Sequence, residues 1–238
     1  MTQDIPSPCE TWALFLDIDG TLLDIAQEPG AVIVPPDLPE VLEAVGKRLG
    51  GALAIITGRG LADIERLLAP LKPPCAAEHG AIVRLGDGTV FEPDASRSVP
   101  ATWRQRIRAA AEGWPGVLVQ DKQFSLSVHY RLAPEHEAEI RSLVAAVVAE
   151  DPEFEALPAR MAVEVRHRAL HKGEGLRALM LHAPFKGRKP VFVGDDVTDE
   201  DGFRAARALG GLGLEVGEAF AGKPANVRRW LASFAAGT

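Results

Sequence analysis

Two aspartates follow an apolar stretch near the start of the chain. Residues 14–16 are apolar, and Asp17, Asp19 and Gly20 come soon after them. Because side chains alternate along a strand, both carboxylates can reach the same crevice. One carboxylate can attack phosphorus to form an aspartyl-phosphate, and a second carboxyl group can protonate the leaving oxygen and then activate water. The pair indicates phosphoryl transfer, and Gly20 lets a ligand approach bare backbone.

Other polar residues also stand at the tips of predicted elements, namely Thr57, Lys172, Asp195 and Asp196. Two carboxylates facing a phosphate would repel it, so a hard cation must lie among them. An all-oxygen ligand set, which Asp195 can complete, favours Mg²⁺. Thr57 and Lys172 supply the donor and the positive charge that the oxygens of the transferring group need.

Each feature also has a purely structural explanation. An aspartate before a glycine favours a turn, and Thr57-Gly58-Arg59 is compatible with a simple strand-to-helix turn. The acidic residues within 198–201 can cap a helix and complement its dipole. Lys172 fits such an explanation poorly, because a cation at the start of a helix lies at the unfavourable end of the dipole. The four tips together favour a site.

The elements that must position these tips alternate between strand and helix. Apolar stretches at 52–56 and 190–193 are typical of buried strands, and 38–49 has helical spacing. A second helix at 61–68 and a short strand before Glu78 complete a run that predicts a parallel sheet with right-handed crossovers. Later elements of the same kind are expected at 173–182, 199–209, 212–216 and 227–234.

The middle of the chain has an antiparallel rhythm instead. A hairpin is expected around Gly86-Asp87-Gly88, since 81–85 and 89–92 flank it. Alternation along 124–130 predicts a strand with one apolar and one polar face. The expected elements here are strands at 117–120, 124–130 and 161–165 and helices near 101–112 and 140–147. We predict a core of residues 1–85 and 167–238, with a smaller α+β domain inserted at 86–166.

Composition narrows the class of protein. The chain has 238 residues, 47% of them hydrophobic and 25% charged, which is ordinary globular usage. A net charge of -7 argues against nucleic acid and anionic membranes as partners. Cys9 and Cys75 are the only cysteines and lack a metal-like spacing. With no signal-like start or membrane-spanning run, a cytoplasmic protein is expected.

In order and strand context, these motifs resemble those of the haloacid-dehalogenase-like phosphatases. Within that superfamily the chain resembles the trehalose-6-phosphate phosphatases over nearly its whole length. The stretches that carry this resemblance are 77–80, 121–122, 129–131, 163–166, 171–173 and 194–200. The resemblance implies a Rossmann-like core with a mobile cap, and a sugar phosphate bound between them. It also implies a functional link to a trehalose-6-phosphate synthase.

The resemblance also implies roles for single residues. Asp17 is the nucleophile, Asp19 is the acid/base whose carbonyl binds the metal, and Asp195 is a further metal ligand. Asp196 and Asp199 are expected to hold these three residues in place without touching the substrate. Residues expected around the substrate are Gly20, Thr21, Gly58, Arg59 and Glu78 in the core and Lys122, His129, Glu164 and Arg166 in the cap.

Three positions depart from the family pattern. Gln120 stands where glutamate is usual, Arg160 where lysine is common and His167 where proline is common. These departures leave the core chemistry untouched and bear on the cap. The sequence thus predicts a Mg²⁺-dependent trehalose-6-phosphate phosphatase. The alternatives are a phosphatase of sucrose phosphate or another glycosyl phosphate, a phosphosugar mutase and a non-catalytic sugar-phosphate sensor.

Overall fold

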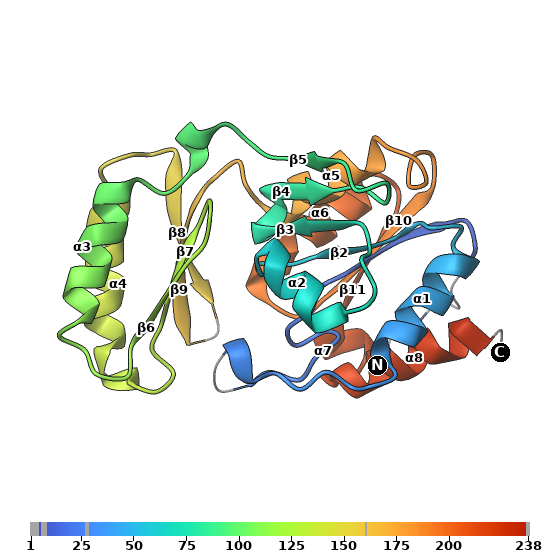
Figure 1. Cartoon of the computed structure of the whole chain (residues 1–238), viewed down its shortest axis with the longest axis horizontal. Helices are drawn as coiled ribbons and strands as arrows, with labels where there is room; N and C mark the ends of the chain where they lie inside the picture. The colour runs from blue at the N-terminus through green and yellow to red at the C-terminus, as the bar shows by residue number, and fades with distance from the viewer. Residues whose placement is uncertain (1–4, 6–8, 27–28, 160, 237–238) are drawn as a thin grey trace. The chain divides into compact units, whose positions relative to one another are not determined.

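The computed structural model describes residues 5, 9–26, 29–159 and 161–236. The described part of the chain divides into two compact units (Figure 1). The larger unit extends to Glu92 and resumes at His171, and the smaller unit spans Pro93–Leu170. Among these residues, no helix has the length and apolar character that crossing a membrane requires.

The larger unit is built on one mostly parallel sheet with the strand order β11-β10-β1-β2-β3-β4-β5. Its strands are β1 (Trp12–Leu16), β2 (Leu53–Ile56), β3 (Cys75–Ala77), β4 (Ile82–Arg84), β5 (Val90–Phe91), β10 (Lys189–Gly194) and β11 (Leu212–Glu215). Strands β11, β10, β1, β2 and β3 run parallel, and β4 and β5 are antiparallel additions. Every residue of β1 is buried, as expected for a central strand covered on both faces.

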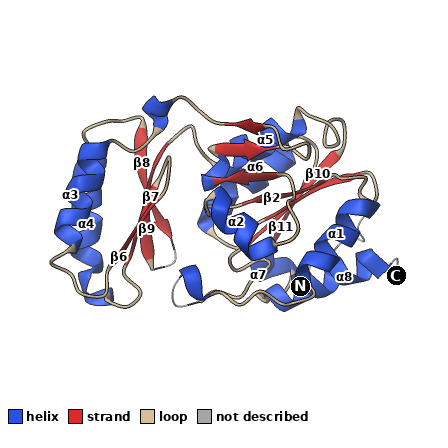
Figure 2. Cartoon of the chain, in the orientation of Figure 1, coloured by secondary structure: helices blue, strands red, loops and turns tan. Residues whose placement is uncertain are grey.

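Helices cover this sheet, as the blue and red elements of Figure 2 show. They are α1 (Leu38–Arg48), α2 (Leu61–Leu68), α5 (Lys172–Met180), α6 (Glu200–Ala208), α7 (Val216–Ala219) and α8 (Pro224–Ala236), with short 3-10 turns η1 (Pro29–Ala31), η2 (Glu78–Gly80) and η5 (Val197–Asp199). Helix α1 packs with α8, and α5 packs with α6. The α/β class and the parallel sheet predicted from the sequence are confirmed.

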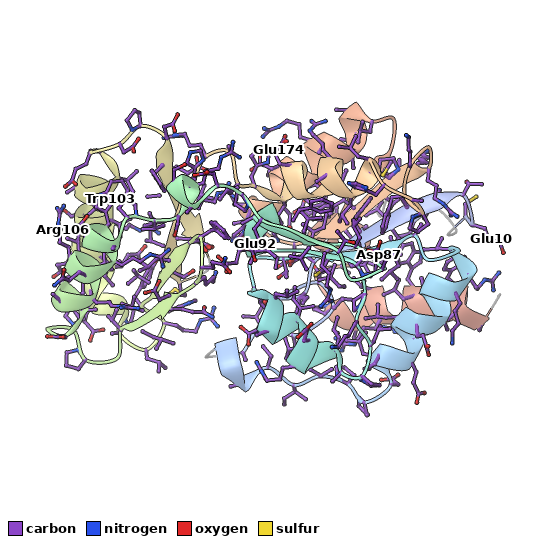
Figure 3. The ribbon with its side chains drawn as sticks, turned by 45° about the horizontal axis from the view of Figure 1, so that its top comes forward. Glu10, Asp87, Glu92, Trp103, Arg106 and Glu174 are labelled. Atoms are coloured by element: carbon purple, nitrogen blue, oxygen red, sulfur yellow. The ribbon has the colours of Figure 1, made fainter. Side chains whose placement is uncertain are left out.

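The smaller unit is an antiparallel sheet with the order β6-β7-β9-β8, packed on two helices. Its elements are η3 (Ala95–Arg97), α3 (Ala101–Ala111), β6 (Leu118–Asp121), β7 (Leu126–His129), η4 (Pro134–His136), α4 (Glu137–Val148), β8 (Phe154–Ala159) and β9 (Ala162–His167). Leu126 and Val128 of β7 pack with Trp103 of α3 and Val144 of α4 in one buried cluster. Figure 3 labels Trp103 and Arg106 on α3; Trp103 is in this cluster, and Arg106 pairs with Glu150.

The boundaries between the units differ from those expected. The smaller unit begins at Pro93, not at 86, because β5 pairs with β4 and the hairpin stays on the edge of the larger sheet. It ends at Leu170, not at 166, because β9 continues to His167 and pairs there with Phe154. The assignment of the two units as catalytic core and cap remains a prediction.

Candidate active site

The polar tips of β1 and β10 lie side by side in the larger unit. Leu16 pairs with Val193 in parallel register, and the backbone N–H of Asp17 donates to the carbonyl of Val193 at 3.0 Å. Asp17 and Asp195 therefore emerge from neighbouring strands at the same edge of the sheet. Such an edge, at the carboxyl ends of parallel strands, is where open α/β sheets bind ligands.

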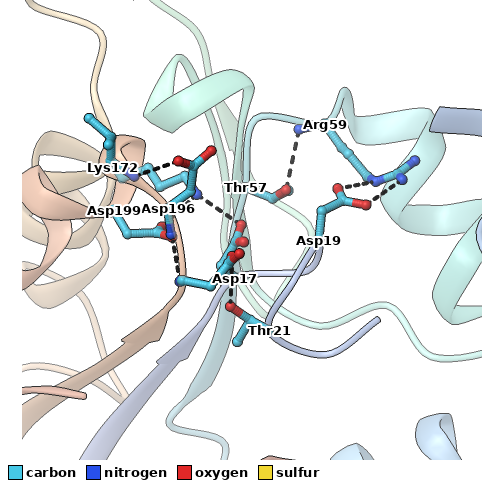
Figure 4. A network of polar contacts seen from close by, with 10 residues as sticks. Asp17, Asp19, Thr21, Thr57, Arg59, Lys172, Asp196 and Asp199 are labelled. Atoms are coloured by element: carbon cyan, nitrogen blue, oxygen red, sulfur yellow. Dashed lines mark hydrogen bonds and ion pairs between the residues drawn. The ribbon is translucent and has the colours of Figure 1, made fainter. Parts of the chain in front are cut away.

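Lys172, the first residue of α5, joins this edge from a third element (Figure 4). Its Nζ donates to Oδ1 of Asp17 at 2.9 Å and to Oδ1 of Asp199 at 2.6 Å. All three side chains are almost completely buried. Removing one partner from such a buried set leaves an uncompensated charge, so the three groups hold one another in place.

Asp199 anchors the network to the backbone. Its Oδ2 accepts the N–H groups of Asp195 at 2.9 Å and of Asp196 at 3.0 Å, while Oδ1 accepts Lys172. Both oxygens are thus engaged, which suits a supporting residue. Asp196 instead caps η5, since its Oδ1 accepts the N–H of Val197. The two residues form a capping box, so the structural explanation of this motif also holds.

Burial among like charges perturbs the acidic groups. Burial raises the pKa of the Asp17 carboxyl well above its usual value, Lys172 opposes this, and Asp199 and Asp195 add to it. Burial and Asp199 raise the pKa of Asp195 to about 7. Burial disfavours the charged form of Lys172, but Asp17 and Asp199 outweigh it and raise the Lys172 pKa. The ammonium therefore stays charged in an environment with excess negative charge.

This excess fits a divalent cation. Carboxylate oxygens of Asp17, Asp195 and Asp199 lie within 4.8 Å of one another. Thr21 Oγ1 donates to Oδ1 of Asp195 at 3.4 Å, and any side chain at Gly20, where φ is +80°, would overlap the Asp195 carboxylate. Only glycine therefore fits at position 20, directly against the Asp195 carboxylate. A hard cation among such oxygens would bring the raised carboxyl pKa values down.

Asp19 lies outside this cluster of carboxylates. Arg59 grips it at two points, with Nε 2.7 Å from Oδ2 and the second guanidinium nitrogen 2.6 Å from Oδ1. The guanidinium is buried, whereas the Asp19 side chain is 38% exposed. The sequence predicts Arg59 near the substrate but carries no signal for this pair, because the long arginine side chain reaches Asp19 from another loop.

Thr57 and Gly58 lie in the loop that leads from β2 to α2. The N–H of Arg59 donates to Thr57 Oγ1 at 3.3 Å. Beside this loop, Glu78 and His79 are both buried and have positive φ angles of 45° and 60°. Left-handed conformations cost about 1 kcal/mol or more each for residues other than glycine. The loop is therefore bordered by a strained turn.

The predicted cap residues lie on one face of the antiparallel sheet in the smaller unit. Register places Ser127 of β7 opposite both Gln120 of β6 and Glu164 of β9. Lys122 Nζ lies 3.0 Å from Oε1 of Glu164, and both side chains are shielded from solvent. His129 Nε2 lies 3.2 Å from Oε1 of Gln120. Gln120 therefore orients His129 directly.

Arg166 has a partner that sequence reasoning missed. Its Nε donates to Oε1 of Glu155 at 3.1 Å, and Glu155 also accepts from Arg168 at 3.1 Å. Glu155 lies on β8, a strand that was not predicted. His167 Nε2 lies 3.4 Å from Glu153 Oε2, and its Nδ1 accepts the N–H of Ala169. The histidine at this position therefore stabilises the end of β9. Arg160 lies outside the described residues.

The fold, with its inserted α+β unit, is that of the haloalkanoate (HAD) superfamily phosphatases, since such a phosphatase from Bacteroides thetaiotaomicron covers 100% of this chain with a TM-score of 0.61 and 14% identity. The carboxylate cluster at the ends of β1 and β10 fits a divalent metal. The family model for trehalose-phosphatase matches residues 15–230. The chain belongs to the trehalose-phosphatase family.

Curated relatives and a solved structure agree with this assignment. A probable trehalose-phosphate phosphatase of Sinorhizobium fredii is 43% identical over 87% of this chain and 78% of its own length. The trehalose-6-phosphate phosphatase of Escherichia coli is 34% identical, over 90% and 80% of the two chains. The C-terminal domain of the Candida albicans trehalose-6-phosphate phosphatase covers 95% of this chain and 93% of its own, with a TM-score of 0.78 and 22% identity.

Proposed function

We propose that this chain hydrolyses trehalose 6-phosphate to trehalose and inorganic phosphate. The observation that carries the proposal is the buried set of Asp17, Lys172 and Asp199 at the sheet edge of a chain in the trehalose-phosphatase family. The ammonium of Lys172 opposes the raised pKa of Asp17, and a divalent cation beside the carboxylates would complete the stabilisation of the anionic nucleophile. Trehalose 6-phosphate is the substrate in the name of the Escherichia coli relative. We further propose that a trehalose-6-phosphate synthase supplies it.

The chemistry is a double displacement at phosphorus. A carboxylate oxygen of Asp17 attacks phosphorus, and the bond from phosphorus to the sugar oxygen breaks as Asp19 gives that oxygen a proton. Water then attacks the aspartyl-phosphate, Asp19 takes its proton, and the bond from phosphorus to Asp17 breaks. Atoms balance, since one water is consumed and one phosphate is released.

Other core residues bind the transferring group. Thr57 offers a hydroxyl and Lys172 a fixed charge to the equatorial oxygens. Mg²⁺ held by Asp17, Asp195 and the carbonyl of Asp19 would neutralise the phosphate dianion. The all-oxygen donor set supports Mg²⁺ over softer metals.

We propose that the smaller unit recognises the hydroxyl groups of the sugar. Its polar face presents charged groups already fixed by ion pairs, Lys122 with Glu164 and Arg166 with Glu155. Fixed donors and acceptors of this kind suit sugar hydroxyls, because a substrate that lacks a partner leaves a buried polar group unsatisfied. His129, held by Gln120, is a further group on this face.

The charge of the chain and its cysteines bear on its further partners and on its compartment. The net charge of -7 supports neither nucleic acid nor an anionic membrane surface as a partner. Among the described residues, Cys9 and Cys75 are both unpaired, which supports a reducing, cytoplasmic compartment.

A panel of phosphorylated sugars tests the proposal. Purified protein with Mg²⁺ is given trehalose 6-phosphate, sucrose 6-phosphate, glucose 6-phosphate and glucose 1-phosphate, and released phosphate is measured. We expect kcat/KM to be highest for trehalose 6-phosphate. Preference for sucrose 6-phosphate would establish the alternative phosphatase. Phosphate returned to a sugar would indicate a mutase, and binding without release would indicate a sensor.

A further inference from the structure

The strained turn η2 contacts two parts of the candidate site at once. Glu78 and His79 are consecutive residues with positive φ, and Gly80, with a φ of 101°, follows them. Strained backbone persists only where the surrounding structure fixes it, and it clusters at functional sites. We propose that this turn, and the ring of His79 in particular, positions the Thr57 loop and the start of α5 for catalysis. The inference rests on the proposed function of those two elements.

Backbone hydrogen bonds join the turn to the Thr57 loop. The N–H of His79 donates to the carbonyl of Thr57 at 2.9 Å, and the N–H of Glu78 donates to the carbonyl of Arg59 at 2.9 Å. Both donors belong to the two left-handed residues. An extended backbone would direct these N–H groups elsewhere. The left-handed conformation is therefore what allows both hydrogen bonds to the loop, one on either side of Gly58.

The ring of His79 fills the space over Gly58. A methyl group placed on Gly58 would lie 2.5 Å from Nε2 and 2.7 Å from Cε1 of His79. Gly58 has an ordinary φ, so the need for glycine comes from the imidazole and not from the backbone. His79 itself is almost fully buried. The ring thus sets the position of the loop that carries Thr57 and Arg59, both of which are in Figure 4.

On its other side, the turn η2 fixes the position of the start of α5 through Gly80. A methyl group on Gly80 would lie 2.8 Å from the backbone nitrogen of Gly175 and 2.8 Å from the carbonyl oxygen of His171. One on Gly175 would lie 2.7 Å from Cβ of Ala76. Helix α5 therefore packs backbone to backbone against η2 at its first turn, where Lys172 stands. A shift of the turn would move the donor hydroxyl and the ammonium together.

A size-swap cycle tests the role of His79. The variants are Gly58→Ala, His79→Ala and the double variant, all measured on p-nitrophenyl phosphate and trehalose 6-phosphate. Alanine rather than glycine replaces His79, so the ring is removed while the cost of the left-handed backbone is kept. Gly60→Ala is the matched control, because Gly60 has nothing within 4 Å and an ordinary φ.

We expect Gly58→Ala to lower kcat by at least about 50-fold on both substrates, since misplaced groups lose transition-state contacts. The double variant should recover to within about threefold of His79→Ala, because the clash is gone. His79→Ala alone should lose about tenfold in kcat with little change in KM for the sugar phosphate. Gly60→Ala should stay within about twofold of the wild type.

Strictly additive losses in the cycle, or an equal loss in Gly60→Ala, would overturn the inference. If Gly58→Ala does not fold, the double variant must fold and be active; a double variant that also fails to fold overturns it. Binding of orthophosphate with Mg²⁺, measured by calorimetry, gives a readout that needs no turnover and should show the same rescue. Wild-type protein that does not hydrolyse trehalose 6-phosphate would contradict the proposed function. The cycle measured on p-nitrophenyl phosphate would still decide the role of His79.

Discussion

Arg59 and Asp19 form a two-point ion pair, with N–O distances of 2.7 and 2.6 Å, in which the arginine is buried and the aspartate is partly exposed. A forked guanidinium fixes both the direction and the rotation of a carboxylate, which a lysine cannot do. The geometry thus sets where the proposed acid/base faces before any substrate arrives.

Replacing Arg59 by lysine should separate two substrates. Trehalose 6-phosphate needs a proton on its leaving oxygen, whereas p-nitrophenolate leaves without one. We expect Arg59→Lys to lower kcat on the sugar phosphate by about 10- to 100-fold and on p-nitrophenyl phosphate by less than about threefold. Equal losses on the two substrates would mean that Arg59 acts on phosphate instead.

Asp17→Asn should abolish turnover and keep the fold. The amide is a poor nucleophile of nearly the same shape, and Lys172 retains Asp199 as a partner. We expect kcat below about one hundredth of the wild-type value, a barrier increase of at least about 3 kcal/mol, with a melting transition of unchanged cooperativity. A variant that keeps more activity would exclude Asp17 as the nucleophile.

Removal of metal should remove activity. With only carboxylate and carbonyl oxygens as ligands, protein treated with EDTA should be inactive and should recover with Mg²⁺. Ca²⁺ should bind without restoring turnover, because its longer and looser coordination misplaces Asp17 relative to phosphorus. The checks are phosphate release and competition between the two ions; full activity after exhaustive chelation contradicts the assignment.

Stability should depend on pH through Asp195. Its folded pKa of about 7 is above the model-peptide value of 3.8, so the folded state holds a proton that the unfolded state has lost. This contribution is complete below about pH 4 and disappears as the pH rises through about 7. Mg²⁺ should therefore raise Tm more at about pH 8 than at about pH 5.5, where protons compete for the same oxygens. A larger Mg²⁺ shift at the lower pH would contradict the raised pKa.

Glu164 should affect specificity more than chemistry. We expect Glu164→Ala to lower kcat/KM for trehalose 6-phosphate at least about tenfold and the rate on p-nitrophenyl phosphate less than about threefold. Because Glu164→Ala leaves the buried ammonium of Lys122 without this carboxylate, a double variant with both residues changed to methionine controls for stability. Gln120→Glu should be tolerated, since a carboxylate also accepts from His129. Parallel losses on both substrates would assign Glu164 to the fold.

Apolar runs and polar tips were the predictable part of this protein. Residues 14–16 ended a buried strand as expected, and the tips at Asp17, Lys172 and Asp195 came together because parallel strands share an edge. Strand β8 escaped prediction because Pro158 interrupts its pattern, which an edge strand tolerates. Helix α7, with Val216–Ala219, is too short to show a period.

Side-chain partnerships were the unpredictable part. Nothing in the order of residues shows that Arg59 meets Asp19 or that Arg166 meets Glu155, because such pairs depend on how far long side chains reach between loops. The left-handed Glu78 carries no local signal, and His79 carries only the weak preference of histidine for positive φ. Tertiary contacts impose that conformation.

The pairing of β1 with β10 joins a strand near the start of the chain to one that is translated late. Strand β1 can find β2 early, but its other neighbour is translated only after the whole inserted unit. The inserted sheet draws all its strands from one continuous segment, so its contacts are closer in sequence. High contact order slows folding, and long-unpaired strand edges invite aggregation. During translation, one flank of β1 therefore waits for β10, and chaperones would be most needed in that interval.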